Sequence, residues 1–135
     1  MHLPDMLAVE RCACGCDACG AAIPAGLDHA LARETELGLY HVALTDVPAS
    51  ANDPGTLTVF VTRGPHPAPQ DAEIAIAGGR PRCSCAAPDL AITRRGAGHY
   101  ETAPFAFPSR GWWILRVTVA GEGGRDAVTF NLAIE

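Results

Sequence analysis

The chain has 135 residues, 48% of them hydrophobic and 19% charged, which is the size and composition of one globular domain. Its formal net charge is -5 and its basic residues are not clustered, so the sequence argues against a nucleic-acid partner. No run approaches the roughly 20 apolar residues of a membrane helix, and residues 1–10 lack the pattern of a signal peptide. From these features alone we expect no membrane-spanning segment and, if the start is the natural one, a cytoplasmic location.

The first part of the chain is dominated by cysteines. Residues 11–20 read RCACGCDACG, a C-x-C-x-C-x-x-C pattern without hydrophobic periodicity, so something other than apolar burial must hold this stretch. Further on, Asp28 is a candidate N-cap for a short helix that runs to Leu37. We therefore predict a cysteine-rich extension and linker over residues 1–37, followed by a separate domain over residues 38–135.

From residue 38 onward the pattern is that of β-strands. Apolar and polar positions alternate in short segments, and glycine- and proline-rich turns separate these segments. The predicted strands are residues 39–45, 56–62, 72–77, 89–93, 99–107, 111–119 and 128–134. About seven short strands at this spacing predict an all-β fold, an antiparallel β-sandwich preceded by a short irregular cysteine-rich segment.

The strongest alternation lies in residues 111–135, where two apolar runs flank the turn sequence GEGGRD and predict a β-hairpin. Trp113 shares its parity with the leucines and valines that follow it, so we place it in the core and Trp112 on the outer face. Asp126 is expected to hydrogen-bond the turn, and Tyr100 to lie in the core. Because a single hairpin is not stable in water, the rest of the chain must cover its apolar face.

Four segments in this order carry a resemblance to a known family. They are DAEIAIAGGRP (71–81), GAGHY (96–100), PSRGWWILRVTV (108–119) and DAVTFNL (126–132). Over about residues 38–135 the chain resembles the YtkA-like family, relatives of the FixH-like proteins. The resemblance implies an immunoglobulin-like β-sandwich, a periplasmic or other extracytoplasmic location, a link to copper handling, and a membrane or oxidase-assembly protein as a partner.

The chain departs from that family where a Met-Pro turn and His-rich residues are expected. At this place it has RPRCSC, which brings Cys83 and Cys85. In an extended segment the side chains of residues i and i+2 point to the same side, so both sulfurs can meet one ion. Cys16 and Cys19 have a spacing that chelates within one turn. The predicted metal ligands are Cys12, Cys14, Cys16, Cys19, Cys83, Cys85 and His99.

Thiolates select soft ions, and C-x-C units on a copper-associated scaffold favour Cu(I) over zinc, which needs four ligands in a tetrahedron. An alternative is that the six cysteines form three disulfides, in which case the domain is a structural or interaction module with a stapled N-terminus. A structural zinc site and thiol redox activity also remain open. The sequence contains no G-x-S-x-G, phosphate-loop or H-E-x-x-H motif, so we expect a protein that is not an enzyme.

Overall fold

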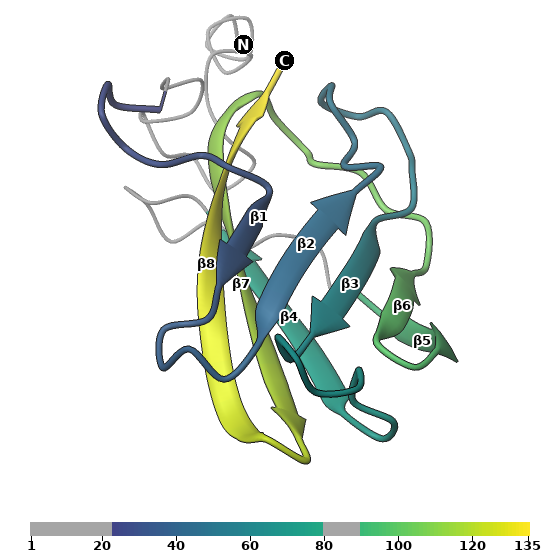
Figure 1. Ribbon diagram of the computed structural model, residues 1–135. Helices are drawn as coiled ribbons and strands as arrows, with labels where there is room; N and C mark the ends of the chain where they lie inside the picture. Colours follow the sequence, from purple (N-terminus) through teal and green to yellow (C-terminus); the bar gives the residue numbers. More distant parts are fainter. Residues whose placement is uncertain (1–22, 80–89) are drawn as a thin grey trace, which may run out of the picture.

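The computed structural model describes residues 23–79 and 90–135, which fold into two antiparallel sheets without a helix (Figure 1). One sheet has the strand order β1-β2-β3-β6-β5 and the other has the order β4-β7-β8. The strands are β1 (Ala32–Glu34), β2 (His41–Thr45), β3 (Thr58–Thr62), β4 (Glu73–Gly79), β5 (Ile92–Gly96), β6 (His99–Thr102), β7 (Gly111–Gly121) and β8 (Gly124–Ile134). The prediction of an all-β, immunoglobulin-like sandwich is confirmed.

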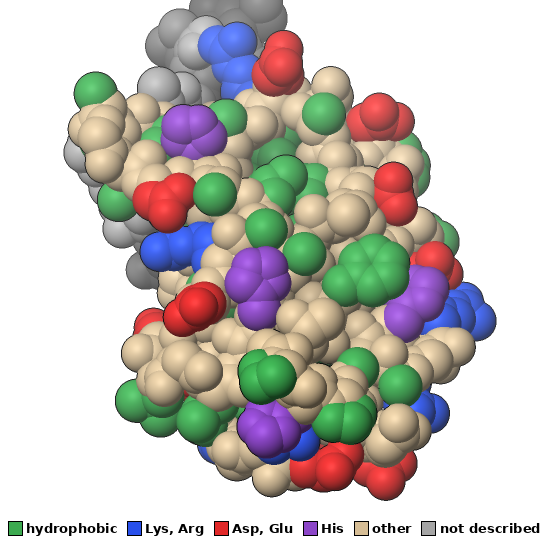
Figure 2. Space-filling view, in the orientation of Figure 1, with side chains coloured by type: hydrophobic (Ala, Val, Ile, Leu, Met, Phe, Trp, Pro, Cys, Tyr) green, Lys and Arg blue, Asp and Glu red, His purple; other side chains and the backbone are tan. Residues whose placement is uncertain are grey.

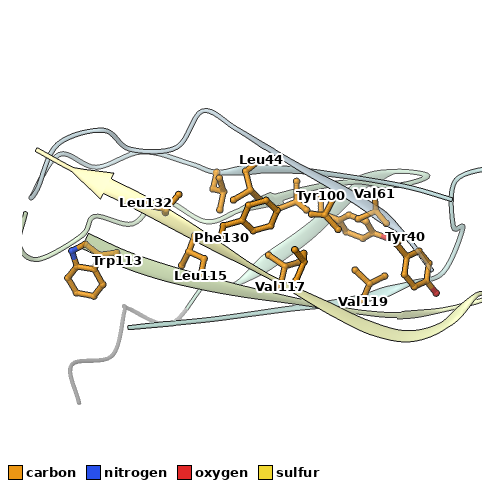
Figure 3. Close-up of a cluster of buried hydrophobic side chains, with 14 of the residues drawn as sticks. Tyr40, Leu44, Val61, Tyr100, Trp113, Leu115, Val117, Val119, Phe130 and Leu132 are labelled. Carbon is orange, nitrogen blue, oxygen red and sulfur yellow. The ribbon is translucent and has the colours of Figure 1, made fainter. Parts of the chain in front are cut away.

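The core lies between the two sheets and is built from the inward-facing positions of the strands (Figure 3). The alternation predicted for the C-terminal hairpin is present: every second residue of β7 and β8 is buried and faces the larger sheet. The fully buried large side chains are Trp113, Tyr40, Phe107, Phe130, Leu57, Leu115, Val42, Val59, Val61, Val117, Val119 and Val128. Burial of this apolar surface is the main favourable contribution to folding.

The two tryptophans lie on the faces that the alternation predicts. Trp113 has no exposed surface, and its indole N–H donates to the Ser109 carbonyl oxygen at 2.7 Å. Trp112 is half-buried on the other face, where its indole N–H donates to the side chain of Asn131 at 3.0 Å. Tyr100 is buried as expected, and its hydroxyl donates to the Ala72 carbonyl oxygen at 3.2 Å.

The helix predicted after Asp28 is wrong. Asp28 does bind a nearby amide, since its carboxylate accepts a hydrogen bond from the Ala30 N–H at 2.9 Å, but this contact forms a turn. The chain then enters β1, which pairs with β2 in antiparallel register. The Arg33 guanidinium also donates to the Thr129 carbonyl oxygen on β8. These tertiary contacts outweigh the weak helical preference of the segment, and β1 joins the larger sheet ahead of residue 38.

Several strand limits also differ from the prediction. The last hairpin is longer than expected, because its strands run to Gly121 and restart at Gly124, with a two-residue connection between them. In contrast, β6 ends at Thr102, and Phe105 instead forms an isolated bridge with Gly55. The strand predicted at residues 89–93 is shifted and lies at Ile92–Gly96.

We predict that Trp113→Ala lowers the free energy of unfolding by about 3–5 kcal/mol, because it leaves a cavity between the sheets. Trp112→Ala is expected to cost much less, since that side chain is only partly buried. Urea denaturation followed by circular dichroism measures both values. A larger loss for Trp112→Ala than for Trp113→Ala would contradict this assignment of the two faces.

Candidate functional site

The six predicted cysteine ligands lie outside the described residues, so the structure locates only the residues that flank them. Gly79, the last residue of β4, precedes the segment with Cys83 and Cys85, and Leu90 follows it. Residues 23–31 follow the N-terminal cysteines. The position of these flanking residues decides whether the two cysteine groups are attached to the same part of the sandwich.

Residues that flank the two cysteine groups lie near each other on the smaller sheet. Gly79 pairs with Ile114 of β7, and Ile114 pairs in turn with Asn131 of β8. The Asn131 amide, itself buried, donates to the Asp28 carbonyl oxygen at 2.8 Å. Neighbouring strands are about 4.8 Å apart, so Gly79 lies about 10 Å from Asn131 across the ladder.

The other residues that flank the two cysteine segments contact the larger sheet, and they lie at the same end of the sandwich. The Leu44 N–H, near the end of β2, donates to the Leu31 carbonyl oxygen at 2.7 Å. The chain returns to the sandwich at Leu90, and the Ala103 N–H binds the Ala91 carbonyl oxygen at 2.8 Å, just beyond the end of β6. We call this end, where β8 and the chain itself also finish, the C-terminal end of the sandwich (Figure 1).

His99, the one predicted ligand within the described residues, begins β6 and faces outward from the larger sheet. Its ring is stacked on that of Phe60, with 4.7 Å between ring centroids and 19° between the planes. Histidines on this face are spread out and do not gather at one point (Figure 2). Within residues 23–79 and 90–135, no three His, Cys, Asp or Glu side chains are placed to hold a metal ion. The assignment of His99 as a ligand stays a prediction.

A groove of about 570 Å³ lies at the other end of the sandwich, away from the C-terminal end. Glu34 and His41 face each other across the β1–β2 pair and line this groove together with Tyr40, Arg63 and His66. Sequence reasoning does not bring His41 and His66 together with Glu34, because it does not predict the β1 strand. The alternation of β2 is the one signal that marks His41 as outward-facing.

Asp126 does not line this groove, but it holds the β1–β2 loop, whose residue Leu39 does. Asp126 is only 5% exposed. Its carboxylate accepts hydrogen bonds from the backbone amides of Leu37 at 2.9 Å, Leu39 at 3.2 Å and Ala127 at 2.8 Å. The expected bond to its own hairpin turn is therefore replaced by bonds to the β1–β2 loop, which comes from the other sheet.

Burial by itself raises the pKa of Asp126, because it disfavours the charged form. Hydrogen bonds from Thr35 and from the three amides favour the carboxylate and outweigh this effect, so the pKa lies below its ordinary value of 3.8. The same loop is tethered at the surface by Arg116, whose guanidinium donates to both Glu36 carboxylate oxygens at 2.9 and 3.1 Å. This hydrogen-bonded contact lowers the pKa of Glu36.

No family model and no curated protein matches the chain. Among solved structures, the fold is similar to that of a DUF4426 family protein from Pseudomonas aeruginosa PAO1, with a TM-score of 0.53 and 16% sequence identity. The similarity covers 72% of this chain and 91% of that one. At this identity the likeness extends to the β fold alone. In the described part of the chain, none of the structure forms a helix long and apolar enough to cross a membrane.

We predict that Asp126→Asn destabilises the protein by about 1–3 kcal/mol at pH 7, since an amide group cannot accept all of these hydrogen bonds. Because the pKa of Asp126 is lowered on folding, its contribution is fully present above about pH 4 and is lost as the pH falls through the lower folded value. The difference between the wild-type protein and the variant should therefore shrink in acid.

Urea unfolding at a series of pH values from 2.5 to about 7 measures this difference. Glu73→Gln, which removes an exposed carboxylate on β4, is the matched control and should leave the profile unchanged. A wild-type–variant difference that stays constant down to the lowest pH would contradict the assigned role of Asp126.

Proposed function

We propose that this protein binds a soft metal ion, with Cu(I) preferred to zinc, through its cysteine thiolates, and that it serves copper sequestration or delivery. The observation that carries the proposal is the common attachment of the two cysteine groups. Gly79, four residues before Cys83, and Asp28, nine residues after Cys19, both attach to the β7–β8 pair at the C-terminal end of the sandwich.

The lengths of the connecting segments allow the two groups to share a centre. Four residues span at most about 14 Å when extended, and nine span about 30 Å. Gly79 and Asn131 are about 10 Å apart across two strand spacings, and the Asn131 side chain touches Asp28. The separation of the anchors is therefore smaller than the combined reach of the segments that carry the thiols.

The donor set fits Cu(I) better than a hard ion. Thiolate sulfur is a soft ligand and selects Cu(I) or zinc over magnesium or calcium. Zinc is satisfied by four ligands, which residues 12–19 alone supply, whereas six thiols in two groups offer more donors than one zinc ion uses. Because the described residues hold no three-ligand group of their own, the proposed donors are the cysteines, with His99 as a further predicted ligand.

The β-sandwich supports a carrier or scaffold role, since it offers a rigid body to which both cysteine groups are attached. The resemblance to YtkA-like and FixH-like proteins supports a particular class of protein partner. We propose an extracytoplasmic location and transfer of copper to a membrane or oxidase-assembly protein. A cytoplasmic copper buffer is the corresponding proposal if the natural chain carries no export signal.

Native mass spectrometry with and without reductant tests the metal hypothesis directly. Bound Cu(I) adds the mass of whole copper ions to the reduced protein, whereas each disulfide makes the untreated protein lighter by two hydrogen atoms. Three disulfides that persist in protein from its natural compartment, with no copper taken up after reduction, would favour the stapled structural module instead.

The shared centre is tested by Cys83→Ser/Cys85→Ser, which removes two of the six thiols. We expect Cu(I) stoichiometry to fall by about a third and the remaining ions to bind more weakly, because fewer thiolates bridge them. Titration against a competing Cu(I) chelator measures both quantities. Ser84→Ala, which alters the same segment and keeps both thiols, is the matched control, and His99→Ala tests the predicted histidine ligand. Equal stoichiometry and affinity in the double variant would separate the two cysteine groups.

A further inference from the structure

The four sheet edges of the sandwich are not protected equally. A strand at a sheet edge presents unpaired backbone groups that can template pairing with another chain, and proteins usually block such edges. Here β1 is only three residues long, and β5 carries two arginines and a register shift between Arg94 and Gly96. The edge of β8 is covered, because Arg33 and the Glu36 N–H bind its carbonyl oxygens at Thr129 and Ala127.

Among residues 23–79 and 90–135, none of these devices is found at the edge formed by β4. It is seven residues long, pairs with β7 in regular register, and contains neither a proline nor a basic residue. In the part of the chain that the structure describes, no backbone hydrogen bond joins β4 to any strand but β7. The outward-facing positions of the strand are Glu73, Ala75 and Ala77, so its middle carries only small side chains there.

The inward side of β4 leaves apolar surface incompletely covered. Ile74 and Ile76 pair with Val119 and Val117 of β7, and those two valines have no exposed surface. The isoleucines themselves are only partly buried, although they pack against the same core. A further strand alongside β4 would bury more of both isoleucines and would also pair the outer backbone groups of β4, which no described strand pairs.

We propose that β4 pairs with β4 of a second copy of this chain, in antiparallel fashion about a two-fold axis at Ile76. This register places Ala75 opposite the partner's Ala77 and Glu73 opposite the partner's Gly79. Small side chains therefore face each other on the outer surface. The two Glu73 carboxylates lie six residues apart along the joint, about 20 Å, so they do not repel strongly. The two three-stranded sheets become one continuous sheet across the dimer.

The proposal is independent of the metal hypothesis and is tested on the full chain with reductant and chelator present, which removes cysteine cross-links and metal bridges. Sedimentation velocity over a range of protein concentrations measures the self-association. We expect a monomer–dimer equilibrium whose dissociation constant rises at least about tenfold in Ala75→Lys/Ala77→Lys, because like charges then stand opposite each other twice. Ala133→Lys is the matched control, since Ala133 is an exposed alanine on the other edge strand of the same sheet.

Hydrogen exchange of the β4 amides assigns the interface. We expect protection of these amides to increase with protein concentration, and circular dichroism should show that the lysine variant keeps its fold. A chain that stays monomeric at all concentrations would overturn the proposal. So would a dimer that both lysine variants leave unchanged, or β4 amides that are fully protected in the dilute monomer, because in that case the chain covers its own edge.

Discussion

The apolar face of the β7–β8 hairpin is the constraint on which the rest of the sandwich depends. Each strand has eleven residues, and their inward positions bury the largest side chain of the core, Trp113, together with Phe130. A lone hairpin of this kind would expose that face to water and would not be stable. The larger sheet supplies the missing cover through β2 and β3, whose inward residues, such as Val42 and Val59, have no exposed surface. The order of the other strands follows from this requirement.

Packing alone does not align the two sheets, and two tyrosines at one end of the core contribute a directional contact. Tyr40, which directly precedes β2 of the larger sheet, donates its hydroxyl to the Gly124 carbonyl oxygen of β8 at 2.7 Å. Tyr100, on β6, reaches the Ala72 carbonyl oxygen beside β4. Each ring is buried while its hydroxyl finds an acceptor on the opposite sheet, so neither polar group is left unpaired. Asp126 adds a third such tie, from β8 to the β1–β2 loop.

How much the sequence predicts depends on the range of the interaction involved. Strand parity is a local property, so the inward position of Trp113 and the outward position of Trp112 were predictable from alternation. Gly98 of the GAGHY segment has both a local and a long-range reason: its φ is +69°, and a side chain there would come within 2.3 Å of the Val61 carbonyl oxygen on β3. That motif is therefore a requirement of the scaffold, whatever chemistry the protein performs.

The errors arose where a partner distant in sequence decides the outcome. The stretch after Asp28 has a capping residue and some helical preference. It forms the strand β1 because it pairs with β2 and because Arg33 binds the backbone of β8. Asp126 similarly binds a loop about 90 residues away in the sequence, and no local sequence pattern predicts this contact. Prediction of the candidate metal site from the sequence is limited for a different reason. Cysteine spacing indicates chelation, but it cannot choose between a metal and disulfides, because both satisfy the same thiols.

Asn131 shows why the residues before β1 belong to the sandwich energetically as well as in sequence. Its side-chain oxygen accepts from the Trp112 indole N–H, and its NH₂ group donates to the Asp28 carbonyl oxygen. The indole N–H can only donate a hydrogen bond and the carbonyl oxygen can only accept one. These two partners therefore fix the orientation of the Asn131 amide. The position of the half-buried Trp112 is thus explained by an intramolecular hydrogen bond. If residues 23–31 detached, this buried amide would lose its acceptor at a cost comparable to that of an unpaired polar group. Asn131 therefore ties Asp28 to the β7–β8 hairpin at a position that pairs with Ile114 and lies two strands from Gly79.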